Sequence, residues 1–295
     1  MTRYIYVMEG TFMDQEKAKQ LIFQKIKNLP TLPDIVQKLI TLIQDERTSA
    51  GDLSKLISYD QAISIKLLKV ANSAYYGFLK EVATIQHAIV ILGFEEVKRL
   101  SLGISILNFM NDESSLIMQN LWKHSVGCSL AAQIISKKIN VEPDIIPTSS
   151  LLHDIGKLVL DNVFNKEYKA VMEKIKTGNS STLDAEKEIL GVDHADVGLW
   201  LCTKWKLPPA LILPIAYHHQ VEKADKDTIL NVSVVHLADI VCHKAGMGNY
   251  GNATIPPFQE AAQKTLQINE EDMGPMVEDL QCEEEKIEAF ISAIK

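Results

Sequence analysis

The segment spanning residues 150–160, SLLHDIGKLVL, places His153, Asp154 and Lys157 inside an otherwise apolar run. The apolar residues suit the interior of a helical domain. Ionisable groups in such an interior need partners, because burial takes them out of water. The segment therefore indicates a buried polar site within a hydrophobic core.

Apolar residues recur at three- and four-residue spacing along most of the chain, as in the stretch 33–46, PDIVQKLITLIQDE. This spacing is typical of amphipathic helices. Ser49 and Asp52 resemble a capping box, and Thr84 and Gly93 suit the two ends of another helix. No run alternates at period two for long enough to predict a sheet, and the best strand candidate is the short stretch 4–7. The sequence predicts an all-α fold.

The polar interval 111–115, NDESS, divides the helical pattern into two lobes. A segment rich in glycine and asparagine, 246–252, followed by Pro256 and Pro257, indicates a loop or linker. The expected parts are an N-terminal segment, a first lobe, a second lobe, and a C-terminal linker with helices, covering 1–14, 15–112, 113–245 and 246–295. The helices expected in the second lobe cover 117–139, 147–162, 165–177, 182–190, 193–205, 208–219 and 228–245.

Composition excludes several classes of function. A chain of 295 residues with 46% hydrophobic residues can bury a large core, and its net charge of -8 argues against binding to nucleic acid. No apolar run reaches the roughly 18 residues that a membrane span needs, and the first residues lack the apolar region of a signal peptide. We expect a soluble cytoplasmic protein with no membrane or nucleic-acid partner. The four cysteines are widely spaced, which predicts reduced and mostly buried thiols.

Five otherwise apolar helices of the second lobe carry seven histidines and aspartates: His124, His153, Asp154, His194, His218, His219 and Asp239. His124 is in register with Cys128 and points inward. Asp193 can cap the helix that begins with His194, where the positive end of the helix dipole favours a neutral imidazole. His218 and His219 would lie about 100° apart around a helix and so could serve two neighbouring ions.

Any single inward histidine is most simply a hydrogen-bonded core residue. Together, five histidines and two aspartates would each need a partner, and one metal centre supplies a partner to all of them. Nitrogen and oxygen donors without thiolate suit iron, manganese, nickel or zinc. We expect divalent metal ions, two in number, with iron as the first choice. His87, His236 and His243 are expected to be ordinary residues.

The same residues resemble the metal-binding positions of the HD superfamily of metal-dependent phosphohydrolases, with 153–157, HDIGK, matching a variant typical of HD-GYP proteins. The first lobe is similar to HDOD domains in three stretches: 28–33 (NLPTLP), 63–76 (ISIKLLKVANSAYY) and 85–93 (IQHAIVILG). The resemblance covers roughly residues 15–245. Gln61 stands where HDOD domains usually have proline, and no Gly-Tyr-Pro segment follows His219, which argues against a cyclic di-GMP phosphodiesterase.

The resemblance implies a two-lobed helical HDOD architecture and a bacterial signalling or regulatory role, with a protein partner and a retained two-metal site. The alternative is a metal-dependent phosphohydrolase acting on a nucleotide or cyclic dinucleotide. In that alternative Asp154 would bridge two ions that activate water, and Lys157 would hold a phosphate oxygen. Lys157 could equally be a surface lysine that covers apolar residues with its stem. A third reading is a helical scaffold with an accidental histidine cluster.

Overall fold

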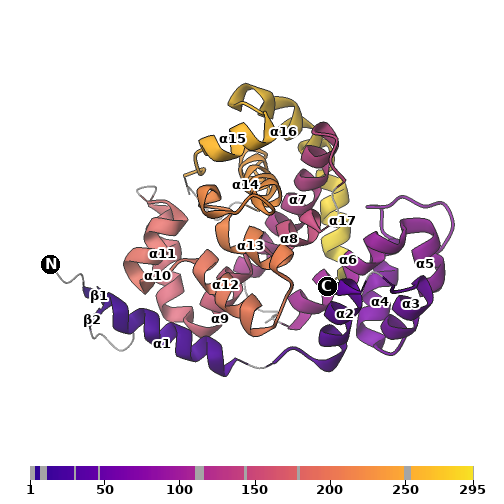
Figure 1. Cartoon of the computed structure of the whole chain (residues 1–295), viewed down its shortest axis with the longest axis horizontal. Coiled ribbons are helices and arrows are strands. Elements are labelled where there is room, and N and C mark those ends of the chain that lie inside the picture. Colours follow the sequence, from indigo (N-terminus) through magenta and orange to yellow (C-terminus); the bar gives the residue numbers. More distant parts are fainter. Residues whose placement is uncertain are drawn as a thin grey trace.

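Helices form nearly all of the chain that the structure describes (Figure 1). The structure is a computed structural model, and it describes residues 4–6, 12–29, 31–45, 47–109, 116–142, 145–177, 180–248 and 254–294. Within these ranges the only sheet is an antiparallel pair of three-residue strands, β1 (Tyr4–Tyr6) and β2 (Phe12–Asp14). The predicted all-α class is confirmed, and β1 falls within the predicted strand candidate 4–7.

The first part of the chain forms α1 (Gln15–Asn28), α2 (Asp34–Gln44), α3 (Ala50–Ser58), α4 (Gln61–Ala71), α5 (Ile85–Leu92) and α6 (Phe94–Phe109). The predicted caps are confirmed. Ser49 and Asp52 form a capping box at the start of α3, and the Thr84 hydroxyl accepts a hydrogen bond from the backbone N–H of His87 at the start of α5. Gly93 ends α5 with a φ of 93°, a left-handed value that glycine adopts without strain.

The second part forms α7 (Leu116–Lys138), α8 (Ile146–Leu152), α9 (Ile155–Val163), α10 (Asn165–Lys176), α11 (Thr182–Leu190), α12 (His194–Lys204), α13 (Pro209–Tyr217), the short 3-10 helix η1 (Val221–Lys223) and α14 (Ile229–Lys244). The helices α15 (Glu260–Leu266), α16 (Met273–Cys282) and α17 (Glu284–Ile294), with the 3-10 helix η2 (Glu270–Asp272), complete the chain. The predicted lobe boundary at 111–115 and part of the predicted linker, 249–253, lie outside the described residues.

Two predicted helices of the second lobe are wrong in their extent. The helix predicted over 147–162 is two helices, α8 and α9, with His153 and Asp154 in the turn between them. The helix predicted over 208–219 ends at Tyr217, so His218 and His219 lie in a turn. The spacing of apolar residues does not reveal either interruption, because it continues through the two turns as it does in the neighbouring helices.

In the second part α7, α8 and α14 contact one another and α13 packs on α8 and α14, whereas α9 to α12 pack on one another and, through α12, on α13 (Figure 1). The helices α2 to α6 gather at the other end of the molecule, and α17 packs on both α4 and α7. The helix α1 lies apart from α2 to α6 and contacts α11 and α12. The Lys204 ammonium of α12 fastens this contact by donating to the carbonyls of Ile26 (3.1 Å) and Lys27 (2.7 Å), at the last turn of α1. A positive charge at the carbonyl end of a helix also suits the helix dipole.

The stretch 67–77, LLKVANSAYYG, holds the first lobe against the rest of the molecule. Asn72 follows α4 and ties down the next loop, because its side chain donates to the Val82 carbonyl (2.9 Å) and accepts from the Val82 N–H (2.7 Å). Tyr75 packs edge-on against Phe290 of α17, with ring centroids 5.3 Å apart. This stretch is therefore a structural joint between α4 and α17.

A buried polar network joins α6 to α7. The Arg99 guanidinium of α6 donates to the Ser129 hydroxyl of α7 (2.9 Å) and pairs with Glu96, which also accepts a hydrogen bond from the Tyr76 hydroxyl. Arg99 and Ser129 are buried, whereas Glu96 and Tyr76 are half-buried. One continuous hydrophobic core includes both lobes. No helix among the described residues is both long and apolar enough to cross a membrane.

Candidate metal centre

The seven predicted histidines and aspartates come together at the centre of the second lobe. They are supplied by the middle of α7 (His124), the turn between α8 and α9 (His153 and Asp154), the start of α12 (His194), the turn after α13 (His218 and His219) and α14 (Asp239). All of them are buried except His219, which is half-buried. Residues up to 115 positions apart in sequence are thus within contact distance.

Gly156 makes this convergence possible. A Cβ added at Gly156 would lie 1.9 Å from the carbonyl oxygen of His194, which is fixed backbone. Only glycine therefore lets the first turn of α9 approach the first turn of α12. As a result Asp154 Oδ1 lies 3.2 Å from His194 Nε2.

Asp154 is at the centre of the cluster. Its Oδ2 lies 3.6 Å from His124 Nε2, 3.5 Å from His153 Nε2 and 2.6 Å from Lys157 Nζ. Its Oδ1 faces His194 instead. Because the two oxygens have different neighbours, the carboxylate can serve two cations at once, as the prediction of a bridging role requires.

The histidines on either side of Asp154 form two groups. In the first, Asp239 Oδ1 lies 3.0 Å from His124 Nε2 and 3.8 Å from His153 Nε2. The second contains His194, His218 and His219, whose possible ligand atoms lie within 4.8 Å of one another. The helix predicted to carry His218 and His219 ends before them, so they lie in a turn, with ring centroids 4.0 Å apart. Both join His194, and His218 also lies within 4.8 Å of His153 and Asp154.

Most imidazoles are oriented by a contact on the side away from the cluster. His153 Nδ1 contacts the carbonyl of Ser150 (2.7 Å), and His218 Nδ1 contacts that of Ile215 (2.8 Å). His194 Nδ1 lies 2.7 Å from the Glu186 carboxylate. Such contacts fix the ring and leave Nε2 for a metal ion.

Burial and the charges of neighbouring side chains set the protonation states of the clustered histidines and aspartates. Burial lowers the pKa of His153 to about 4 and, together with His153 and His194, lowers that of His218 to about 3. These imidazoles are neutral near pH 7, the form that binds metal. Burial alone would raise the pKa of Asp154, but His153 and Lys157 outweigh it and hold that pKa well below its usual range.

The pKa of His194 moves in the direction opposite to the one expected from the helix start. Asp193 caps α12 as predicted, accepting from the Asp196 N–H. Burial and the Lys157 charge lower the pKa of His194, but the carboxylates of Glu186 and Asp154 outweigh them and raise it. Two buried anions within 3.2 Å of the ring are stronger than the partial charge of a helix end.

Several polar atoms of the cluster fit a cation and have no other hydrogen-bond partner. They are buried and comprise His153 Nε2, His218 Nε2, His219 Nδ1, Asp154 Oδ1 and Asp239 Oδ2. Leaving such atoms unpaired costs about 1–3 kcal/mol each. A metal ion would satisfy imidazole nitrogens and carboxylate oxygens together, so the donor set suits one or more divalent ions.

Residues that the sequence did not single out also belong to the site. His243, predicted to be ordinary, has its Nε2 3.3 Å from Asp239 Oδ1. His236, also predicted to be ordinary, contacts the carbonyl of His218 through Nδ1 (2.6 Å). Cys128 Sγ lies 3.5 Å from His124 Nε2. The i, i+4 spacing of Asp239 with His243 and of His124 with Cys128 was the signal available. His87 lies on α5, away from the cluster.

A cleft of about 220 Å³ leads to the cluster from the surface. It is lined by Lys157, His194, His219, Asp239 and His243, by the start of α11 and by residues 254–257. The alternative that Lys157 is a surface lysine is contradicted, because Lys157 is 5% exposed and contacts Asp154.

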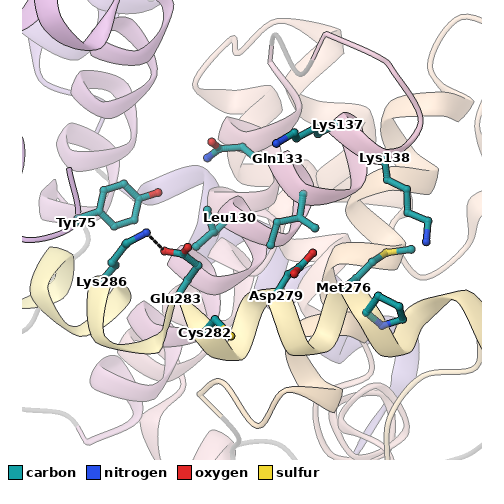
Figure 2. A pocket seen from close by; sticks show the side chains of 12 residues that line it. Tyr75, Leu130, Gln133, Lys137, Lys138, Met276, Asp279, Cys282, Glu283 and Lys286 are labelled. Atoms are coloured by element: carbon teal, nitrogen blue, oxygen red, sulfur yellow. Dashed lines mark ion pairs between the residues drawn. The ribbon is translucent and has the colours of Figure 1, made fainter. Parts of the chain in front are cut away.

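A larger cleft, of about 800 Å³, lies between α7 and the pair α16 and α17 (Figure 2). Tyr75, Lys137 and Lys138 line it together with Asp279, and Lys286 pairs with Glu283 there (2.5 Å). None of the clustered histidines reaches it. Size alone therefore does not mark the chemical site of this protein.

Comparison with known proteins identifies the class to which this fold and site belong. The model of the HDOD domain family matches residues 29–221, so the chain belongs to the HDOD family. The chain is 25% identical over 229 residues to an uncharacterized protein of Treponema pallidum, a match that covers 76% of this chain and 44% of that protein. It is 24% identical over 140 residues to the uncharacterized protein YuxH of Bacillus subtilis, covering 47% and 32%. The matches thus span less than half the length of these relatives.

Solved structures share the fold. An HDOD domain protein of unknown function from Geobacter sulfurreducens has a TM-score of 0.78 at 22% identity, with 96% of this chain and 99% of that chain covered. A candidate phosphohydrolase from Shewanella amazonensis has a TM-score of 0.74 at 22% identity, covering 93% and 98%. A candidate signal transduction protein from Marinobacter aquaeolei has a TM-score of 0.78 at 18% identity, covering 95% and 65%. At these identities the structures establish the fold alone.

Proposed function

We propose that the protein is a bacterial signalling or regulatory HDOD protein whose second lobe holds two divalent metal ions. The observation that carries this proposal is the set of unpartnered, buried donor atoms that converge from three parts of the chain: the turn between α8 and α9, the turn after α13, and α14. One ion would be held by His124, His153 and Asp239. The other would be held by His194, His218 and His219, and Asp154 would lie between the two ions. Iron is the first choice for both ions, and manganese, nickel and zinc are the alternatives.

A regulatory role is supported by the position of α7. This helix carries His124 into the cluster and, five residues later, carries Ser129, which accepts the hydrogen bond from Arg99 of the first lobe. Ordering α7 around a metal ion would therefore also order the contact between the lobes. The output would be a surface presented to a protein partner of the same signalling pathway.

Elemental analysis of the purified full chain tests the metal centre. We expect two ions per chain and slower hydrogen exchange in α7 and α6 when the ions are bound. If the protein binds no ion when supplied with any divalent metal, the result would support the alternative of a helical scaffold with an accidental histidine cluster.

Phosphohydrolase activity is the second candidate, and the cleft of about 220 Å³ favours it. Bound ions would supply an activated water and polarise a phosphoryl group. Lys157 lines the cleft and would hold a phosphate oxygen by its positive charge. Glu186 would keep the ring of His194 in place at the same opening.

Incubating the metal-loaded protein with nucleotides, cyclic dinucleotides and simple phosphodiesters tests this candidate. Turnover that depends on both the metal and Lys157 would establish it. A protein that holds two ions and turns over none of these substrates with any divalent metal would leave the regulatory role alone.

A further inference from the structure

Cys128 is buried in the metal cluster and faces the nitrogen of His124 that points into it. The two residues are one helical turn apart on α7, and Cys128 Sγ lies 3.5 Å from His124 Nε2 and 4.0 Å from His124 Nδ1. Its sulfur and the ligand atoms of His124, His153 and Asp239 all lie within 4.8 Å of one another.

We propose that Cys128 is a thiolate ligand of the ion held by His124, His153 and Asp239. This inference rests on the two-metal centre proposed above. It changes the donor set of that ion from nitrogen and oxygen alone to a mixed set that includes sulfur. The thiol proton would pass to solvent as the ion binds, because a coordinated thiol is deprotonated.

The separation of Cys128 and His124 agrees with two ligands of one zinc ion. Zinc binds thiolate sulfur at about 2.3 Å and imidazole nitrogen at about 2.0 Å, so tetrahedral angles separate the two donors by about 3.5 Å. The separation of Cys128 Sγ and His124 Nε2 is 3.5 Å. His153 Nε2 and Asp239 Oδ2 are buried and unpartnered in the same place, which indicates independently that a cation belongs there.

Cys242 is a neighbouring thiol with a different role. It lies on α14 and donates to the carbonyls of His124 (3.5 Å) and Met247 (3.8 Å). Its thiol also hydrogen-bonds to the side chains of His124 and Cys128. The group of possible ligand atoms within 4.8 Å of one another nevertheless includes Cys128 and not Cys242.

A thiolate changes which metals the centre accepts. Sulfur ligands favour zinc and other thiophilic ions over magnesium, calcium and manganese. With Asp154, which the two ions would share, the first ion would have five protein donors. Of these donors only Asp239 lines the cleft, whereas His194 and His219 of the second group both line it.

X-ray absorption spectroscopy of the zinc-loaded full chain, with elemental analysis of the same sample, tests the inference. We expect a sulfur neighbour at about 2.3 Å from zinc in the wild type and in Cys202→Ser, which removes a buried thiol outside the cluster. Cys128→Ser should lose that sulfur. Its zinc affinity should fall by more than the roughly 10–100-fold caused by losing a residue that only orients a ligand. Cobalt-loaded protein should likewise show a thiolate charge-transfer band that only Cys128→Ser abolishes.

The outcomes separate this inference from the proposed metal centre. Bound zinc with only nitrogen and oxygen neighbours, or an unchanged sulfur signal in Cys128→Ser, would overturn the role of Cys128 and leave the metal centre standing. A chain without any bound ion would remove both. If Cys128→Ser does not fold, the Cys202→Ser/Cys242→Ser double variant decides, because it retains only Cys128 and the exposed Cys282. Retention of the sulfur signal there supports the inference, and its loss overturns it.

Discussion

The chemistry of the site depends most on Asp154, because its two oxygens face different neighbours. Oδ2 lies near His124, His153 and Lys157, whereas Oδ1 lies 3.2 Å from His194 Nε2. In the absence of a cation, the buried carboxylate is stabilised by Lys157 and the histidines, which hold its pKa well below the usual range. A buried carboxylate that keeps its charge is available to a metal ion at any physiological pH.

Asp154→Asn should therefore lower the metal content of the protein. The amide keeps the shape of the side chain but removes the charge that both groups of ligands share. Breaking the buried pair with Lys157 should also lower the free energy of unfolding by about 3 kcal/mol. Elemental analysis and urea denaturation measure the two effects. Asp279→Asn, the same change at an exposed position of α16, should alter neither. Full metal content in Asp154→Asn would exclude Asp154 as a ligand.

At the scale of elements, the site depends on where helices end. The turn between α8 and α9 presents His153 and Asp154 together, and the turn after α13 presents His218 and His219. The first turns of α9 and α12 can approach because Gly156 has no side chain, and the Gly156 position lies against the carbonyl of His194. The glycine of the HDIGK stretch is thus a packing requirement of two helices.

Gly156→Ala should separate α9 from α12. The new methyl group would overlap a backbone oxygen that cannot move alone, so the free energy of unfolding should fall by about 1–3 kcal/mol. Metal content should fall as well, because Asp154 and His194 would move apart. Gly274→Ala is the matched control, since a Cβ there meets nothing within 4 Å and alanine favours a helix. Equal stability of the two variants in urea denaturation would refute this account of Gly156.

At the scale of the whole molecule, the two lobes are joined by Arg99 of α6, α7 and the terminal helix α17. Arg99 bonds to Ser129 and pairs with Glu96, and Tyr75 packs on Phe290. The stretch 67–77, which makes the first lobe similar to other HDOD domains, supplies Tyr75 and Tyr76 to this joint. The part of the first lobe that is similar to other HDOD domains therefore contacts the terminal helix α17 through Tyr75.

Arg99→Met should weaken the joint. The change removes the partner of Glu96 and of the Ser129 hydroxyl, which should lower the free energy of unfolding by about 3 kcal/mol. Ser129→Ala removes one hydrogen bond and should cost about 1 kcal/mol. In chemical denaturation, the double variant should lose less free energy of unfolding than the sum of the losses in the two single variants. Lys98→Met, at a partly exposed ion pair with Glu95, is the control and should change stability by less than about 1 kcal/mol. Additive effects of Arg99 and Ser129 would show that the two side chains act independently.

Removal of metal should destabilise the whole molecule. An ion that binds only the folded chain adds about 2.7 kcal/mol when free metal is at a hundredfold excess over Kd. Chelation should therefore lower Tm by roughly 4 °C for each such ion in a chain of this size, and adding metal back should restore it. In a thermal melt, Asp154→Asn should show little response to the chelator. A wild-type melt that does not change on chelation would argue against a metal that stabilises the fold.

The sequence alone determined the helical class, the caps at Ser49 and Thr84, and the seven side chains of the cluster. Spacing and capping act between neighbours in the chain, so they can be read without the fold. The ends of α8 and α13, the raised pKa of His194, and the places of Cys128 and His243 were decided by the tertiary structure. Each depends on a group brought close by folding, such as the carbonyl of His194 against Gly156 or the carboxylate of Glu186 against His194. Contacts of this kind leave no periodic trace in the sequence, because they depend on the distance between helices.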